Sequence, residues 1–118
     1  MLTIEEGDRD DIVVVKASGR LTVRDYTGFV PAFERLAKSR GALRVLLDLQ
    51  EFRGWEAPAL WEELKFDATH QGAFRRIAVI GDKRWKAWGT RLSKPFFRAE
   101  MRYFDRAAAD EAWSWLAL

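Results

Sequence analysis

The heptapeptide LRVLLDL at residues 43–49 is an almost unbroken run of large apolar side chains. Such continuous apolarity is typical of a strand covered on both faces in a parallel sheet. Apolar, β-branched runs at residues 2–6 and 12–18 predict two strands before it, and residues 76–81 and 100–105 predict two after it. The first two runs are separated only by a short turn, so we expect the first strand to lie antiparallel at an edge.

Helical patterns separate the later strands. After residues 12–18, Gly19 is expected to break the strand, and Thr22 and Asp25 have the spacing of a capping box. Apolar residues then recur at helical spacing, namely Tyr26, Phe29, Val30, Phe33, Leu36 and Ala37. Pro31 should kink this helix or shift its start, and Gly41 should end it.

Three further helices are expected, from about Pro58 to Gly72, from Lys83 to the Lys94-Pro95 pair, and over residues 106–118. The predicted order is β-β-α-β-α-β-α-β-α. Strands that alternate with helices form parallel sheets through right-handed crossovers. We therefore expect one α/β domain over residues 1–118, with a five-stranded, mostly parallel sheet and an antiparallel first strand.

Composition limits the possible classes of protein. Hydrophobic residues make up 48% of the chain and there are no cysteines, which excludes disulfides, a thiol nucleophile and thiolate metal sites. No apolar run is long enough to cross a membrane, and the acidic N-terminus lacks an apolar signal segment. We expect a cytoplasmic location, with the membrane periphery as an open alternative.

Several motifs distributed over almost the whole chain resemble one family. They are Gly19-Arg20-Leu21-Thr22 with Asp25-Tyr26, Leu60-Trp61-Glu62 with Lys65-Phe66 and His70, the run from Phe74 to Asp82, Trp85 with Trp88, Lys94-Pro95-Phe96, the run from Glu100 to Asp105, and Trp115-Leu116. Together with the element order, they resemble the SpoIIAA-like branch of the STAS domains. The resemblance implies a STAS-like fold, which is shared with lipid-binding CRAL-TRIO domains, so a hydrophobic ligand enters only by analogy of fold.

One departure from the superfamily concerns phosphorylation. Anti-sigma-factor antagonists carry a phosphorylated Ser in an Asp-Ser-Ser-Gly-Leu stretch after the third strand. The corresponding residues 52–60 of this chain read FRGWEAPAL and contain no Ser, Thr or Tyr. A phosphorylation switch adds charge at a helix start, and this helix start has no acceptor.

Candidate catalytic groups are few. Asp48, Asp82 and Asp105 are expected near the C-terminal ends of strands, where open α/β sheets form ligand crevices. They could bind Mg²⁺ or act as an acid/base pair, but the simpler interpretation makes Asp82 and Asp105 helix N-caps and lets Asp48 end a strand. His70 is the single histidine and fits the end of its helix, where a cation is favoured. Nucleotide-binding, hydrolase and metalloprotease motifs are absent, so we expect no enzyme and no cofactor.

Aromatic content is the most unusual feature, with six Trp and eight Phe. In the predicted helix at residues 83–93, Trp85 and Trp88 share one face, and basic residues decorate the rest. Such a helix either packs in the core or binds an apolar ligand or an anionic membrane surface. The candidate ligand-binding residues are Trp61, Lys65, His70, Trp85, Trp88 and Phe96. No nucleic-acid-binding motif accompanies the basic residues, so no nucleic acid is expected.

The last helix suggests an alternative function. Trp113 and Trp115 are two residues apart, about 200° around a helix, so they cannot face the same way. The family pattern places Trp115 inside, which leaves Trp113 partly exposed for a subunit contact. The leading hypothesis is therefore a non-catalytic binding module for a hydrophobic ligand or membrane surface. The alternative is a protein-interaction or regulatory module, or a homodimer.

Overall fold

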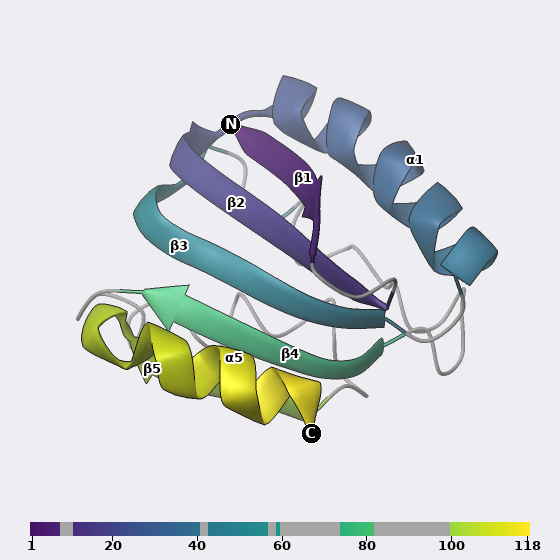
Figure 1. The fold of residues 1–118 in the computed structure, drawn as a ribbon. Helices are drawn as coiled ribbons and strands as arrows, with labels where there is room; N and C mark the ends of the chain where they lie inside the picture. Colours follow the sequence, from purple (N-terminus) through teal and green to yellow (C-terminus); the bar gives the residue numbers. More distant parts are fainter. Residues whose placement is uncertain (8–10, 41–42, 57–58, 60–73, 82–99) are drawn as a thin grey trace.

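The strands form one twisted sheet in sequence order (Figure 1). The computed structural model describes residues 1–7, 11–40, 43–56, 59, 74–81 and 100–118. Within these residues the five strands are β1 (Leu2–Glu6), β2 (Ile12–Leu21), β3 (Leu43–Trp55), β4 (Phe74–Gly81) and β5 (Glu100–Asp105). β1 is antiparallel to β2, and the other neighbours are parallel. The predicted α/β class and the antiparallel first strand are confirmed.

Two helices are described, one on each face of the sheet. The helix α1 (Val23–Arg40) connects β2 to β3, and α5 (Ala109–Ala117) follows β5. A short 3-10 turn, Arg106–Ala108, precedes α5, so the last helix begins later than predicted. The helices predicted near Pro58 and Lys83 lie outside the described residues.

The start of α1 is fixed by the predicted capping box. The Thr22 amide donates to the Asp25 carboxylate at 2.8 Å, and the Asp25 amide donates to the Thr22 hydroxyl at 3.3 Å. Burial alone would raise the pKa of Asp25, but the hydrogen bonds from Thr22 and the nearby Met1 ammonium outweigh it and lower that pKa. Burial, with the Asp25 carboxylate beside it, raises the pKa of Tyr26 to about 12. The helix continues through Pro31, so its start is not shifted.

β2 and β3 are longer than predicted, because they continue to pair beyond their glycines. Gly19 lies inside β2 with φ of 63°, and Gly54 lies inside β3 with φ of 108°. Both backbones have left-handed φ values that glycine adopts without strain, and register shifts accompany them. The prediction that Gly19 breaks its strand is wrong, and β3 extends past the predicted end at Leu49 to Trp55. Phe52 and Trp55 instead belong to β3 and are buried edge to face at 4.9 Å.

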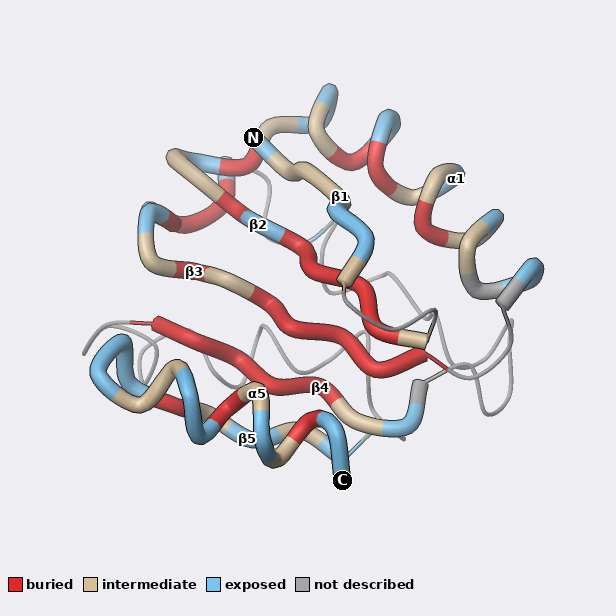
Figure 2. Tube along the Cα trace, viewed as in Figure 1, coloured by how far each residue is buried: buried red, intermediate tan, exposed pale blue. Residues whose placement is uncertain are grey.

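The core is divided by the sheet into two layers (Figure 2). Between the sheet and α1, the helix contributes Tyr26, Phe29 and Phe33, which confirms the predicted apolar face. Between the sheet and α5, the helix contributes Ala112 and Leu116, which are fully buried. The strands place alternate side chains in the two layers, and Val13 and Val14 show this alternation in β2.

Candidate functional site

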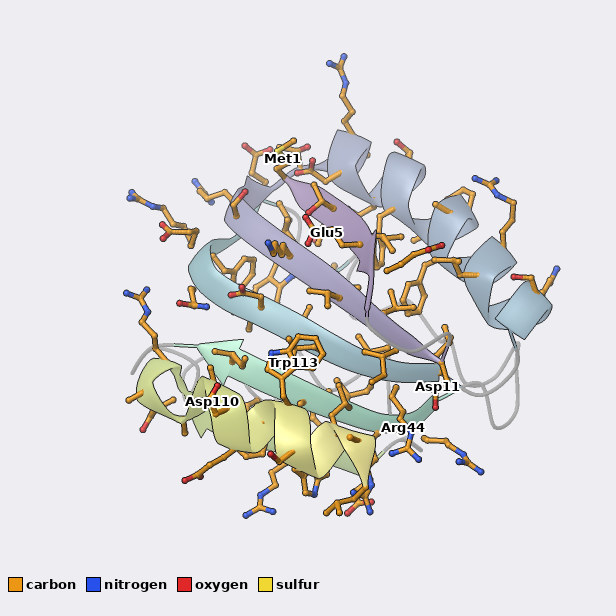
Figure 3. All side chains as sticks on the ribbon, in the orientation of Figure 1. Met1, Glu5, Asp11, Arg44, Asp110 and Trp113 are labelled. Atoms are coloured by element: carbon orange, nitrogen blue, oxygen red, sulfur yellow. The ribbon has the colours of Figure 1, made fainter. Side chains whose placement is uncertain are left out.

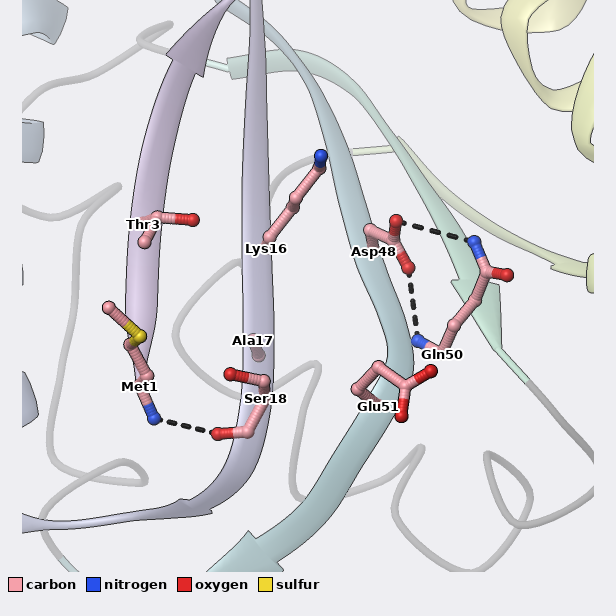
Figure 4. A pocket seen from close by; sticks show the side chains of 8 residues that line it. All are labelled: Met1, Thr3, Lys16, Ala17, Ser18, Asp48, Gln50 and Glu51. Atoms are coloured by element: carbon pink, nitrogen blue, oxygen red, sulfur yellow. Dashed lines mark hydrogen bonds between the residues drawn. The ribbon is translucent and has the colours of Figure 1, made fainter.

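A polar concavity lies on the α5 side of the sheet, over β1, β2 and β3. It has a volume of about 360 Å³ and is lined by polar side chains from all three strands together with Met1 and Ala17. We call these polar residues the polar half-face, and they are Thr3, Lys16, Ser18, Asp48, Gln50 and Glu51. Figure 4 shows how they project from neighbouring strands. The concavity lies over the middle of β2 and β3 and extends towards their C-terminal ends, where open α/β sheets carry ligand sites.

The polar half-face has a mixed charge. The Lys16 ammonium lies 3.3 Å from the Glu5 carboxylate, and both side chains are about half exposed. Asp48 accepts hydrogen bonds from the backbone amide of Gln50 at 3.0 Å and from its side-chain amide at 3.3 Å. Glu51 is exposed at the same rim. The surface therefore carries both positive and negative charges, and it offers both hydrogen-bond donors and hydrogen-bond acceptors.

The three predicted aspartates do not form a described site. Asp48 lies within β3, seven residues before Trp55, which is still paired with β2, so the prediction that Asp48 ends its strand is wrong. Asp105 precedes the 3-10 turn but makes no side-chain capping hydrogen bond, so its predicted capping role is also wrong. Asp82 and His70 lie outside the described residues. Among the residues that are described, no group of three or more carboxylate, His or Cys side chains could hold a metal ion.

The two tryptophans of α5 flank its buried stripe. Ala112 and Leu116 lie one turn apart and are fully buried, whereas Trp113 and Trp115 are both partly buried. Trp115 packs on Phe104, with ring centroids 5.9 Å apart. Figure 3 shows Trp113 on the side of α5 that turns towards β3. The prediction that Trp115 lies inside is only partly correct. Trp113 and Trp115 lie on opposite sides of the buried stripe formed by Ala112 and Leu116, so the sheet covers each of them only in part.

Two arginines hold the C-terminal end of α5, and sequence reasoning missed them. Buried Arg44 donates to the Leu116 carbonyl at 2.6 Å and lies 3.2 Å from the Asp11 carboxylate. Arg76 donates to the Trp115 carbonyl at 2.7 Å and lies over the Trp115 ring at 5.0 Å. Helix C-termini carry unpaired carbonyls and partial negative charge, which cationic donors stabilise. These contacts fix the C-terminal end of α5 over the first residues of β3 and β4.

A second concavity lies between the edge strand β1 and α1. Its volume is about 380 Å³, and Leu2, Ile4, Gly28, Phe29 and Ala32 line it, with Met1, Arg24 and Asp25 completing the wall. We call it the β1–α1 groove. Gly28 opens it, because no heavy atom lies within 4 Å of the position that a Cβ at Gly28 would take.

The predicted ligand-binding residues are not placed by the described structure. Trp61, Lys65, His70, Trp85, Trp88 and Phe96 all lie outside the described residues. Their proposed role stays a prediction from the sequence. Of the helices that are described, none is sufficiently long and apolar to span a lipid bilayer.

Comparisons with known proteins agree with this architecture. The SpoIIAA-like family model matches residues 12–117. The chain belongs to the SpoIIAA-like family. A solved structure of an uncharacterised protein of the DUF3478 family with a SpoIIAA-like fold, from Shewanella loihica PV-4, is similar with a TM-score of 0.72. It is 30% identical, and the similarity covers 98% of this chain and 92% of that one. No curated protein matches.

In this SpoIIAA-like chain, the sequence contained a signal for the polar half-face that our reading missed. Lys16 and Ser18 interrupt alternate positions of a strand whose other face stays apolar, and Asp48 and Gln50 do the same in the next strand. Polar residues at a spacing of two on adjacent parallel strands share one face and lie side by side. The stretch expected to carry a phosphorylated Ser in related domains begins inside β3, where Phe52 and Trp55 are buried.

Proposed function

We propose that this SpoIIAA-like chain is a non-catalytic binding module that docks a protein partner on the polar half-face and on Trp113, which lies on the same face of the sheet. The observation that carries the proposal is a partly exposed indole on the same face of the sheet as a concave, hydrogen-bonding surface. Protein interfaces combine aromatic anchors with polar groups at the rim, and Trp is among the residues that contribute most to affinity. The partner should present an apolar side chain to Trp113 and basic or amide donors to Asp48 and Glu51.

The charge of this surface favours a protein over a polyanion. One lysine, Lys16, lies among the carboxylates of Glu5, Asp48 and Glu51. Nucleic acids and anionic bilayers are attracted by clustered positive charge, which this lining does not provide. A protein surface with charges of both signs can match it group by group, and such matching gives specificity more than raw affinity.

A non-catalytic role is supported by the way Asp48 is held. Both of its carboxylate oxygens accept hydrogen bonds from Gln50, at the point where the register between β2 and β3 shifts. A general base must instead reach a proton on a bound substrate. We propose a cytoplasmic site of action for the module.

The hydrophobic-ligand function stays a second prediction from sequence. It depends on the Trp85 and Trp88 helix, which lies outside the described residues, and one experiment can distinguish the two functions. The protein is purified gently from the cells that make it and weighed by native mass spectrometry before and after organic extraction. A polypeptide bound in stoichiometric amount and kept after extraction supports the protein-partner proposal, whereas a small-molecule mass lost on extraction contradicts it.

Matched variants locate the surface. Trp113→Ser and Lys16→Glu should each release the bound polypeptide. Trp115→Ser removes the same side chain from the opposite flank of α5, and Lys38→Glu reverses an exposed charge on α1. Both controls should retain the polypeptide, with folding verified by circular dichroism. Retention by Trp113→Ser and Lys16→Glu would place the partner elsewhere and refute the proposed surface.

A further inference from the structure

The outer edge of β1 offers backbone groups to another strand. Met1 and Ser18 exchange two backbone hydrogen bonds, at 2.7 and 2.9 Å, and the Gly7 amide donates to the Ile12 carbonyl at 2.9 Å. Along a strand of an antiparallel ladder, the backbone N–H and C=O groups of successive residues point alternately towards the neighbouring strand and away from it. Since Met1 and Gly7 point towards β2, Leu2 and Ile4 must turn their N–H and C=O groups to the outer edge.

This edge lacks three of the features that commonly protect one. Natural edge strands are commonly blocked by Pro, by Lys or by a bulge. β1 contains neither Pro nor Lys, and its pairing with β2 runs from Leu2 to Glu6 without a register shift. The β1–α1 groove lies along the same edge, and its apolar floor includes Leu2, Ile4 and Phe29. In the part of the chain that the structure describes, the edge therefore has both the hydrogen-bonding groups and the space for an added strand.

We propose that the added strand is β1 of a second copy of this chain, paired antiparallel about a two-fold axis at Thr3. In this register, Leu2 of one protomer lies opposite Ile4 of the partner subunit, and the two Thr3 side chains face each other. The pairs at Leu2 and Ile4 use the outward backbone groups and exchange four hydrogen bonds across the axis. The two sheets then become one continuous sheet of ten strands.

In this register the side chains of β1 match those of their own antiparallel copy. Leu2 and Ile4 lie on the α1 side, so apolar side chains meet over the groove, where Gly28 leaves space. Thr3 lies on the α5 side and meets a second Thr, a favourable cross-strand pair. Neither Glu5 nor Glu6 faces another carboxylate. A register centred on Ile4 would instead place Leu2 opposite Glu6, an apolar side chain against a charge.

Charge substitution at Thr3 tests both the dimer and its register. Sedimentation velocity over a concentration series should show a monomer–dimer equilibrium for the unaltered chain. Thr3→Lys and Thr3→Glu each place like charges opposite across the axis and should weaken dimerisation by about tenfold. An equimolar mixture of the two variants should restore the dimer, because opposite charges then face each other. Thr27→Lys adds the same charge on exposed α1 and should leave the equilibrium unchanged.

A cysteine version gives an independent readout, since the chain has no cysteines. Facing residues of a pair without mutual hydrogen bonds have Cα atoms about 4.5 Å apart, within disulfide range. Thr3→Cys should therefore form a disulfide-linked dimer under mild oxidation much faster than Thr27→Cys. A chain that stays monomeric up to its solubility limit, or a dimer that Thr3→Lys leaves intact, overturns the proposal. The purified chain alone is measured, so neither result depends on the protein partner proposed above.

Discussion

The two faces of the sheet are built from the same strands, but one face is fully covered by the core and the other is covered only in part. On the α1 side, β2 and β3 are apolar throughout, with Val15, Ala17, Leu47 and Leu49 all buried. On the α5 side, the first halves of the same strands are apolar except for buried Arg44, and polar residues follow from Lys16 in β2 and Asp48 in β3. One face is a complete core layer, and the other combines a core with a surface suited to binding. Changes at matched positions on the two faces should therefore have very different effects on stability.

The largest effect is expected in the α1 layer. Phe33 is 1% exposed and stacks on Phe29 at 5.2 Å. Phe33→Ala removes this side chain and leaves a cavity, which should lower the free energy of unfolding by about 3–5 kcal/mol. Urea unfolding followed by Trp fluorescence measures it. Arg35→Ala, on the exposed side of the same helix, should change it by less than about 0.5 kcal/mol. Equal losses in both variants would refute the closed-layer interpretation.

The contacts that hold α5 should rank second. Arg44 has a side chain only 8% exposed and donates to both Asp11 and the Leu116 carbonyl. Arg44→Met keeps most of the volume but removes the donor to the Leu116 carbonyl and the ion pair with Asp11, so the free energy of unfolding should fall by about 2–3 kcal/mol. Arg76→Met should cost less, because the Arg76 side chain is 26% exposed and water can replace its contact. Urea unfolding of both variants checks the order, and a larger loss at Arg76 would contradict it.

Local signals predicted much of the α1 side. The helical spacing of Tyr26, Phe29 and Phe33 identified the buried face of α1, and Thr22 with Asp25 identified its start. These signals could be read because each depends on residues within two turns of one another. The second halves of β2 and β3 could not be predicted from such local signals. Gly19 and Gly54 resemble breaks locally, and only pairing between the two strands keeps the chain extended there.

The α5 side depends on contacts distant in sequence. Arg44 and Leu116 are 72 residues apart, and nothing near Arg44 shows that a helix end will cover it. A charged residue in a strand is usually interpreted as facing water, yet Arg44 is buried. The candidate site divides in the same way. The alternation of polar residues in β2 and β3 could have predicted the polar half-face. The ligand-binding residues that were proposed from the Trp content lie outside the described residues.

The capping box should give a smaller effect that depends on pH. Asp25→Ala should cost about 1 kcal/mol near neutral pH, because the Thr22 amide loses its acceptor. The pKa of Asp25 is lowered from 3.8 in the folded state, so the stabilisation is present above that value and is lost as the pH falls below it. Urea unfolding at several pH values should show the two proteins converging in stability below about pH 3.8. A difference that stays constant down to acid pH would exclude the charged cap as its source.

The smallest change in stability is expected on the polar half-face, where the effect on binding should be largest. Lys16 neighbours buried Val15 in the same strand, but its ion pair with Glu5 is about half exposed on both sides. Exposed ion pairs contribute little and weaken further in salt, so Lys16→Ala should change the free energy of unfolding by less than about 0.5 kcal/mol. Val15→Ala removes two methyl groups from the closed α1 layer and should cost clearly more by urea unfolding. A loss above about 1 kcal/mol for Lys16→Ala would mean that the polar residues support the sheet, and the half-face would then not be a surface kept for a partner.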